Sequence, residues 1–318
     1  MNKIVVTGAA GFIGSHLCEH LLSDDSNVVV GVDGFVGETP PSLKKRNLKK
    51  LLTEPRFTFV KVNLLNADWP SILREVDVVF HLAGIPGVRS SWGNEFRPYV
   101  DHNILATQQL LEACRAIRLK KFIYASTSSV YGETSGVTAE DHVTAPLSPY
   151  GVSKRTGEHL CEVYRKAFSV PTLTLRYFTV YGPRQRPDMA FHLFIRKLFQ
   201  NEEIPVFGDG SQTRDFTYVS DCVKGTAAAM KTDEQSCGEI INIGGAERAS
   251  VLEVIKKLET ITGKKANLSF REQQRGEPMH TSADIEKAQR LLGYRPNVSL
   301  DVGLAKEVND LAELYGGT

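Results

Sequence analysis

Apolar residues follow two patterns along the first half of the chain. Short runs rich in valine, isoleucine and phenylalanine predict strands, and stretches with helical spacing of apolar residues lie between them. Strands are expected at residues 3–7, 28–33, 57–62, 76–83, 121–126 and 172–178, and helices at 12–22, 104–117 and 150–168. Nearly continuous apolar strands that alternate with helices are typical of a parallel sheet covered on both faces. The pattern predicts an α/β fold with a doubly wound parallel sheet.

The pattern changes after about residue 180, where proline and glycine separate shorter segments. Ser250 and Glu253 form a Ser-x-x-Glu capping box before an apolar-periodic run, which predicts the start of a helix there. We expect two domains. Residues 1–180 form the first, with some later segments returning to it, and residues 181–318 form a smaller α/β domain.

Composition argues against several classes of protein. The 318 residues are 42% hydrophobic and 24% charged, as in ordinary globular domains, and 38 basic residues nearly balance 37 acidic ones. This balance gives no overall attraction to nucleic acid or to a membrane, and no apolar run is long enough to cross a bilayer. The five cysteines contain no C-x-x-C pair, the histidines show no metal-ligand spacing, and no signal peptide precedes the first strand. We expect a cytoplasmic protein without a metal.

Three glycines, Gly8, Gly11 and Gly14, stand between the first strand and the first helix. Glycines there allow the backbone to approach a pyrophosphate, which the helix N-terminus attracts. Asp33 ends the second strand, where a carboxylate can bind the ribose hydroxyls of NAD and repel the 2′-phosphate of NADP. Neither the glycine loop nor the stretch just after Asp33 contains arginine. The motif favours NAD; a purely turn-forming Asp33 is the alternative.

Tyr150 and Lys154 stand four residues apart, on one face of a predicted helix. A free tyrosine has a pKa of ~10, and a neighbouring lysine and a positive nicotinamide would both favour the phenolate, making Tyr150 a base. A tyrosine that only packs on a lysine stem is the alternative. The sequence STSSVYG at residues 126–132 ends the fifth strand, and sites in open α/β sheets form at such strand ends. It therefore favours catalysis, with Thr127 hydrogen-bonding Tyr150 and relaying its proton.

Together these motifs resemble those of the extended short-chain dehydrogenase/reductase family, the NAD-dependent epimerases and dehydratases. The similarity continues through RYFTVYGP at residues 176–183, GDGSQTRDF at 208–216, and ADI and LGY at 283–285 and 292–294. It implies a Rossmann-type domain that holds NAD, a C-terminal domain that binds a nucleotide sugar, and a homodimer joined by a helix bundle.

The resemblance also implies which residues contact each ligand. For NAD these are Gly8, Gly11, Phe12, Ile13, Gly14, Asp33, Asn63, Leu64, Leu82, Ala83, Gly84, Asn103, Tyr150 and Lys154. For the nucleotide sugar they are Pro86, Gly87, Arg89, Thr127, Ser128, Thr179, Arg186, Val206, Phe207, Arg214, Arg275 and Glu277.

At the nucleotide end, the resemblance assigns Val206 and Phe207 to the uracil and Arg214 and Arg275 to the phosphates. Asn63 and Glu277 replace the aspartates that many relatives have near the adenine and near the nucleotide ribose. Both replacements keep a hydrogen-bond acceptor, so the two contacts are still expected.

The residues after Thr127 bear on the reaction. The family that the chain resembles includes dehydratases, which carry Asp-Glu in this run, and decarboxylases, which carry Glu, whereas this chain has Ser128 and Ser129. Without that acid no evident group protonates or deprotonates C5 or C6 of the sugar. After oxidation at C4, rotation of the 4-keto sugar and re-reduction on its other face is the expected outcome, a 4-epimerisation.

The sequence RQRPDMA at residues 184–190 resembles the same segment of UDP-glucuronate 4-epimerases. Arg186, with the hydroxyls of Ser128 and Thr179, would hold a sugar carboxylate, and Arg89 would be a second cation. The expected conversion is UDP-glucuronate to UDP-galacturonate. A solvated Arg186 in a UDP-glucose/galactose 4-epimerase, a UDP-glucuronate decarboxylase or dehydratase, and a non-catalytic NAD-binding protein are the alternatives.

Overall fold

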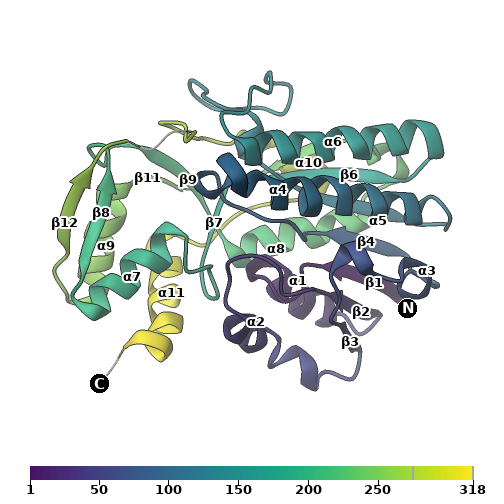
Figure 1. The fold of residues 1–318 in the computed structure, drawn as a ribbon, viewed down its shortest axis with the longest axis horizontal. Helices are drawn as coiled ribbons and strands as arrows, with labels where there is room; N and C mark the ends of the chain where they lie inside the picture. Colours follow the sequence, from purple (N-terminus) through teal and green to yellow (C-terminus); the bar gives the residue numbers. More distant parts are fainter. Residues whose placement is uncertain (246, 274–275, 317–318) are drawn as a thin grey trace.

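A parallel seven-stranded sheet forms the centre of the larger lobe (Figure 1). The computed structural model describes residues 1–245, 247–273 and 276–316. Along the sheet the strands are ordered β10-β6-β5-β4-β1-β2-β3, with every neighbouring pair parallel. Their bounds are Asn2–Thr7 (β1), Asn27–Val32 (β2), Phe57–Val60 (β3), Val78–His81 (β4), Lys121–Thr127 (β5), Thr172–Tyr177 (β6) and Ile240–Ile243 (β10). This order extends that of a dinucleotide-binding sheet by one strand and confirms the predicted fold class.

Helices cover both faces of this sheet because successive strand residues point to opposite faces. In β1, Val5 packs in the core on one side, while Ile4 and Val6 pack in the core on the other. The first core includes α3 (Trp69–Ile72), α5 (Ala106–Cys114) and α6 (Pro149–Phe168). The second includes α1 (Phe12–Leu22), α8 (Val219–Ala228) and α10 (Glu286–Leu292).

The smaller lobe, at the left of Figure 1, contains two short sheets and three helices. Its strands are β7 (Thr179–Tyr181), β8 (Glu203–Phe207), β9 (Thr213–Tyr218), β11 (Glu247–Ser250) and β12 (Asn267–Arg271), and its helices are α7 (Ala190–Gln200), α9 (Val251–Thr262) and α11 (Leu300–Tyr315). The predicted capping box is confirmed, with Ser250 and Glu253 bonding each other's backbone N–H. The domain boundary at residue 180 stays a prediction.

The helix predicted at residues 104–117 differs in detail. A π-helical segment, Val100–Leu105, precedes α5, which begins at Ala106. In this segment the Asn103 side chain bonds the N–H and C=O of Ile85. The backbone carbonyl of Asn103 accepts a bond from the Thr107 hydroxyl at 2.7 Å. Apolar periodicity carries no information on such polar contacts, so the pattern could not reveal the wider turn. Two short helices, α2 (Pro41–Leu48) and α4 (Phe96–Tyr99), complete the fold.

Three further features concern the described residues as a whole. None of the helices there has the length and apolar character needed to cross a membrane. No three His, Cys, Asp or Glu side chains in those parts of the chain are grouped so that they could hold a metal ion. All five cysteines are free thiols, and four of them are buried.

Candidate functional site

A cavity of about 680 Å³ opens between the two lobes, at the carboxyl ends of the large sheet's strands. Its walls include the glycine loop after β1, the residues that follow β2 to β6, the start of α6, and residues 185–194. In open α/β sheets this edge is where ligands bind. Of the predicted site residues that the structure describes, all line the cavity except Asn103 and Val206. Arg275 lies outside the described residues.

The expected contact of the Val206 side chain with a uracil is wrong, because that side chain is fully buried in the core. In β8 alternate residues point to opposite faces, so Pro205 and Phe207 face the cavity when Val206 does not. Asn103 is also buried and does not line the cavity. Its amide joins the loop at Ile85 to Ser153 in α6, with 2.9 Å from Nδ2 to Oγ, and thereby positions both.

The glycine loop has a shape that requires glycine. Gly8 has φ = +74°, and a Cβ added to Gly14 would lie 2.1 Å from the Gly8 carbonyl oxygen. Gly11, which has no side chain, caps α1, so the first N–H groups of this helix face the cavity. This arrangement fits the pyrophosphate of a dinucleotide.

Asp33 lies at the end of β2 and lines the cavity. Its carboxylate accepts bonds from Ala10 N at 3.1 Å, Phe35 N at 2.7 Å and Lys44 Nζ at 3.2 Å. Asp33 therefore organises the turn, as the alternative held, and also presents an acceptor at the place where the ribose of NAD would lie. No sequence pattern indicated Lys44, since this buried pairing depends on where α2 packs in the fold.

Tyr150 is in the first turn of α6, which Ser148 caps by accepting a bond from Gly151 N at 3.1 Å. In the protein without its ligands, burial raises the pKa of Tyr150. The Thr127 hydroxyl and the Arg186 cation lower this pKa, but by less than burial raises it. The lower phenol pKa expected from Lys154 is therefore not seen. The Lys154 ammonium lies 4.3 Å from the ring centroid of Tyr124, and burial lowers its pKa to about 8.

Thr127 is the last residue of β5, and Ser128 and Ser129 follow it in a short helical turn. The Thr127 hydroxyl accepts a bond from Ser129 N at 3.1 Å and lies 3.3 Å from Ser129 Oγ. All three residues line the cavity beside Tyr150. The cluster of hydroxyls predicted from the sequence is thus present at one wall of the site.

Two arginines gather at another part of the cavity around Glu277. Arg89 Nε lies 2.6 Å from one Glu277 oxygen, and Arg214 Nη2 lies 3.4 Å from the other. The Arg89 guanidinium also stacks 4.4 Å from the centroid of the Phe207 ring. These contacts place Arg89 with the residues assigned to the nucleotide. Its part as a second cation for the carboxylate stays a prediction.

Arg186 follows β7 in a loop and lies in the cavity with Tyr150, Ser128 and Thr179. Its guanidinium forms a forked ion pair with Asp188, at 3.0 Å from Nε to Oδ1 and 2.7 Å from Nη2 to Oδ2. Asp188 was not among the predicted site residues. The segment RPDMA contained the signal, because an aspartate two residues from an arginine can reach it.

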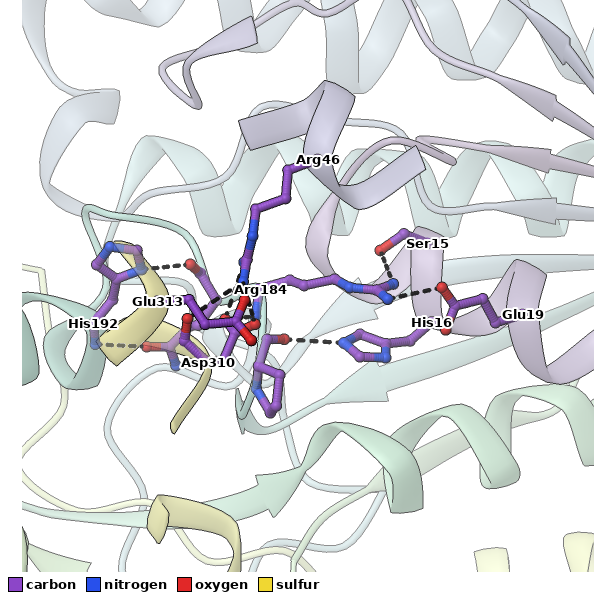
Figure 2. Close-up of polar contacts among 10 residues, drawn as sticks. Ser15, His16, Glu19, Arg46, Arg184, His192, Asp310 and Glu313 are labelled. Carbon is purple, nitrogen blue, oxygen red and sulfur yellow. Dashed lines mark hydrogen bonds and ion pairs between the residues drawn. The ribbon is translucent and has the colours of Figure 1, made fainter. Parts of the chain in front are cut away.

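The loop before Arg186 is anchored to both lobes (Figure 2). Arg184, at φ = +66°, donates its backbone N–H to Asp310 at 2.9 Å, and its guanidinium reaches Glu19 at 2.7 Å and Ser15 at 3.2 Å. Arg46 of α2 bonds the same Asp310 at 2.9 Å. The loop therefore joins α11 to α1, the helix that begins at the glycine loop, so the cofactor wall and the Arg186 wall are mechanically connected.

Comparisons with known proteins agree with this geometry. The chain matches the NAD dependent epimerase/dehydratase family over residues 4–244. It is 56% identical to a UDP-glucuronic acid 4-epimerase from Bacillus cereus, solved in complex with UDP-glucuronic acid and NAD, with a TM-score of 0.97 over 98% of this chain and 100% of that one. A UDP-glucuronate 4-epimerase of Thermodesulfobacterium geofontis is 38% identical over 314 residues, which cover 97% of this chain and 96% of the relative.

A Bacillus subtilis protein described as the uncharacterized UDP-glucose epimerase YtcB is 59% identical over 315 residues, or 99% of each chain. The family match and these relatives together extend over nearly the whole sequence. The protein therefore belongs to the NAD-dependent epimerase/dehydratase family.

Proposed function

We propose that this protein is an isomerase that interconverts UDP-glucuronate and UDP-galacturonate by NAD-dependent epimerisation at C4. One observation carries the choice of substrate: the Arg186 guanidinium shares a cavity with Tyr150 and acts on its pKa, and Ser128 and Thr179 line the same cavity. A cation and two hydroxyls beside the base suit a sugar acid. The relative from Bacillus cereus, solved with UDP-glucuronic acid and NAD, supports the same choice.

NAD would lie along the glycine loop, with its pyrophosphate at the start of α1 and a ribose at Asp33. It supplies a two-electron acceptor that takes the C4 hydrogen of the sugar and returns it. Asn63 and Leu64 follow β3 and line the adenine end, and residues 82–84 line the path toward Tyr150. The Cβ-free backbone at Gly8 and Gly14 fits this cofactor.

Tyr150 would remove the proton of the C4 hydroxyl while C4 is oxidised, and return it when C4 is reduced. Thr127, whose hydroxyl lowers the Tyr150 pKa, would relay the proton. The Lys154 ammonium, held one turn further along α6, would hold the cofactor and add positive charge near the phenolate.

The 4-keto intermediate of a uronic acid is a β-keto acid, which loses CO₂ when its C5–carboxylate bond aligns with the carbonyl π system. An epimerase must hold that bond near the carbonyl plane. Charge-assisted bonds from Arg186, with Ser128 and Thr179, would do so, at about 1.5–3 kcal/mol for each. These bonds also stabilise the negative charge on the carboxylate, which opposes movement of the electrons of the C5–carboxylate bond into the ring.

The nucleotide end would be held by Phe207 against the uracil and by Arg214 and Arg89 on the diphosphate. Glu277 pairs with both arginines and so fixes their separation before the diphosphate binds. We assign Arg275 to the same phosphates from the family resemblance.

We also infer a homodimer joined through α5 and α6, in the cytoplasm. Apolar side chains exposed on and beside these helices support a partner: Val152 at 48%, Val163 at 55% and Phe168 at 47% on α6, and Leu105 at 42% just before α5. Light scattering after size-exclusion chromatography should give about twice the chain mass of 35.2 kDa, and Val152→Glu with Val163→Glu should give the monomer.

The proposed function is tested by separate incubation with UDP-glucuronate, UDP-glucose and UDP-xylose, with products resolved by NMR. We expect UDP-galacturonate as the main product and much slower epimerisation of the two sugars without a carboxylate. Faster turnover of UDP-glucose would favour the neutral-sugar alternative. Loss of CO₂ as the main outcome would favour a decarboxylase.

A further inference from the structure

Asp188 occupies the Nε/Nη2 edge of the Arg186 guanidinium, an edge through which arginine can bind a carboxylate. Its two oxygens each accept one N–H, from Nε at 3.0 Å and from Nη2 at 2.7 Å. This forked geometry is the one by which guanidinium recognises any carboxylate. A sugar carboxylate cannot take the same two donors while Asp188 holds them.

The ion pair faces the reacting part of the cavity. Both partners line the cavity with Tyr150. The Tyr99 ring lies 6.2 Å from that of Tyr150. Burial raises the pKa of the Tyr99 phenol, and Arg186 and Asp188 are both near enough to act on it, the first lowering this pKa and the second raising it. The pair, in the loop after β7, therefore lies in the part of the cavity near Tyr150 of α6 and Tyr99 of α4.

The backbone around the pair is fixed, so an exchange of partners requires only side-chain rotation. Gln185, next to Arg186, accepts a bond from His192 Nδ1 at 2.7 Å on its carbonyl and one from His192 N at 3.1 Å on its side chain. The Arg186 carbonyl accepts the Met189 N–H at 3.1 Å. The side chains themselves are more open: 24% of Arg186 and 37% of Asp188 is exposed. Asp188 can therefore be hydrated when Arg186 leaves it, at little desolvation cost.

We propose that Asp188 is an internal substitute for the substrate carboxylate: it holds Arg186 in the free enzyme, and the carboxylate of UDP-glucuronate displaces it. This inference rests on the proposed function and adds a specificity-determining residue to it. A nucleotide sugar without a carboxylate leaves the pair intact and gains nothing from Arg186. Only the acidic substrate must therefore break the Arg186–Asp188 ion pair in order to bind.

A positioning role gives the opposite expectation. If Asp188 served to orient Arg186 toward the substrate, its removal would loosen the guanidinium and weaken binding of UDP-glucuronate. If Asp188 competes with the substrate, its removal frees the guanidinium and strengthens that binding. The sign of one measured change therefore decides between the two roles.

The experiment is calorimetric titration of NAD-loaded protein with UDP-glucuronate, UDP-glucose and UDP, all in the Tyr150→Phe background so that no turnover occurs. Adding Asp188→Asn should lower the Kd of UDP-glucuronate by about two- to fivefold, as expected for loss of a partly exposed ion pair, and leave the other two within about 1.5-fold. The control is Asp301→Asn, which removes the same charge from an exposed pair with Lys257 outside the cavity wall and should change none of them.

An unchanged or higher Kd for UDP-glucuronate in Asp188→Asn contradicts the inference, as does equal tightening of all three ligands. Failure of the proposed function looks different: the Tyr150→Phe parent itself would bind UDP-glucuronate no better than UDP-glucose. Even then, the sign of the Asp188→Asn effect on UDP-glucuronate decides the role of Asp188.

Discussion

Lys154 carries its charge at a position where burial disfavours it. The side chain is 6% exposed, and burial lowers its pKa from 10.5 to about 8. Between these two values the unfolded chain binds the proton more readily than the fold does, so stability rises as the pH increases through this window. Below pH 8 the whole cost, about 3 kcal/mol, is present. The residue is thus retained at the expense of stability, as is usual for functional groups.

Lys154→Met should therefore stabilise the fold at pH 7 by up to about 3 kcal/mol while kcat falls by ~10²-fold or more. Urea unfolding of the cofactor-depleted proteins at pH 7 and pH 10 gives the stabilities, and the gain should shrink at the higher pH. A variant less stable than the parent at pH 7 would show that contact with the Tyr124 ring outweighs the burial of charge.

Tyr150→Phe should keep the fold and the affinity for UDP-sugars while kcat falls by ~10²–10⁴, the usual range for a lost acid–base group. Burial raises the pKa of this phenol. Turnover of the parent should therefore increase with pH until the phenol ionises. Steady-state rates from pH 6 to 10 give this profile. Near-normal turnover by Tyr150→Phe would mean that another group is the base.

At the scale of elements, the catalytic helix α6 is tied to the sheet by a buried ion pair. Glu158 of α6 accepts two bonds from Arg176 of β6, at 2.9 and 2.8 Å, and one from Ser126 of β5 at 2.6 Å. Both partners are almost completely buried. The Arg176 guanidinium and these hydrogen bonds hold the pKa of Glu158 below its ordinary value despite burial.

Arg176→Leu should cost about 3–5 kcal/mol of unfolding free energy, because it leaves a buried carboxylate without its main partner. A lowered pKa adds stability above the unfolded pKa of 4.5, and that stability is lost as the pH falls through the folded value. The deficit of the variant, measured by denaturant unfolding, should thus shrink below about pH 4.5. A deficit that is small at pH 7 would contradict this account.

The loop before Arg186 offers a matched pair of changes in α11. Asp310→Ala removes the acceptor of Arg184 N and of Arg46, and should raise the KM for UDP-glucuronate several-fold and destabilise the fold by about 1–3 kcal/mol. Glu313→Ala removes one contact to Arg46 from a side chain that is 75% exposed, and should change stability by less than about 0.5 kcal/mol. Steady-state kinetics and thermal unfolding measure both. Equal effects of the two changes would mean that the anchoring of the loop is unimportant.

At the scale of the whole molecule, the sequence predicted what is encoded locally. The strand runs, the glycine loop, Asp33 and the spacing of Tyr150 and Lys154 each depend on residues close together in the chain. What was missed depends on tertiary contacts. Arg89 pairs with Glu277, 188 positions away, which places it with the residues assigned to the nucleotide. Val206 was assigned from a motif, and only the burial of β8 shows which side of the strand faces the cavity.

A cavity lined by both lobes, with α1 joined to the loop before Arg186 through Arg184, should release its cofactor slowly. A redox cycle that returns its hydrogen has no need to exchange NAD. We expect purified protein to contain NAD(H), with NADP below about a tenth of it, since Asp33 would repel a 2′-phosphate. Chromatography of the denatured supernatant measures both. A majority of NADP would contradict the role given to Asp33.

The most direct test of the central claim is to follow the C4 hydrogen. UDP-glucuronate deuterated at C4 should be converted to UDP-galacturonate that retains the deuterium at C4 in essentially every molecule, because the atom moves to the bound cofactor and back without exchanging with water. NMR and mass spectrometry of the product in ordinary water give the retained fraction. Product that has exchanged its deuterium for solvent hydrogen, or the absence of UDP-galacturonate, would contradict the account.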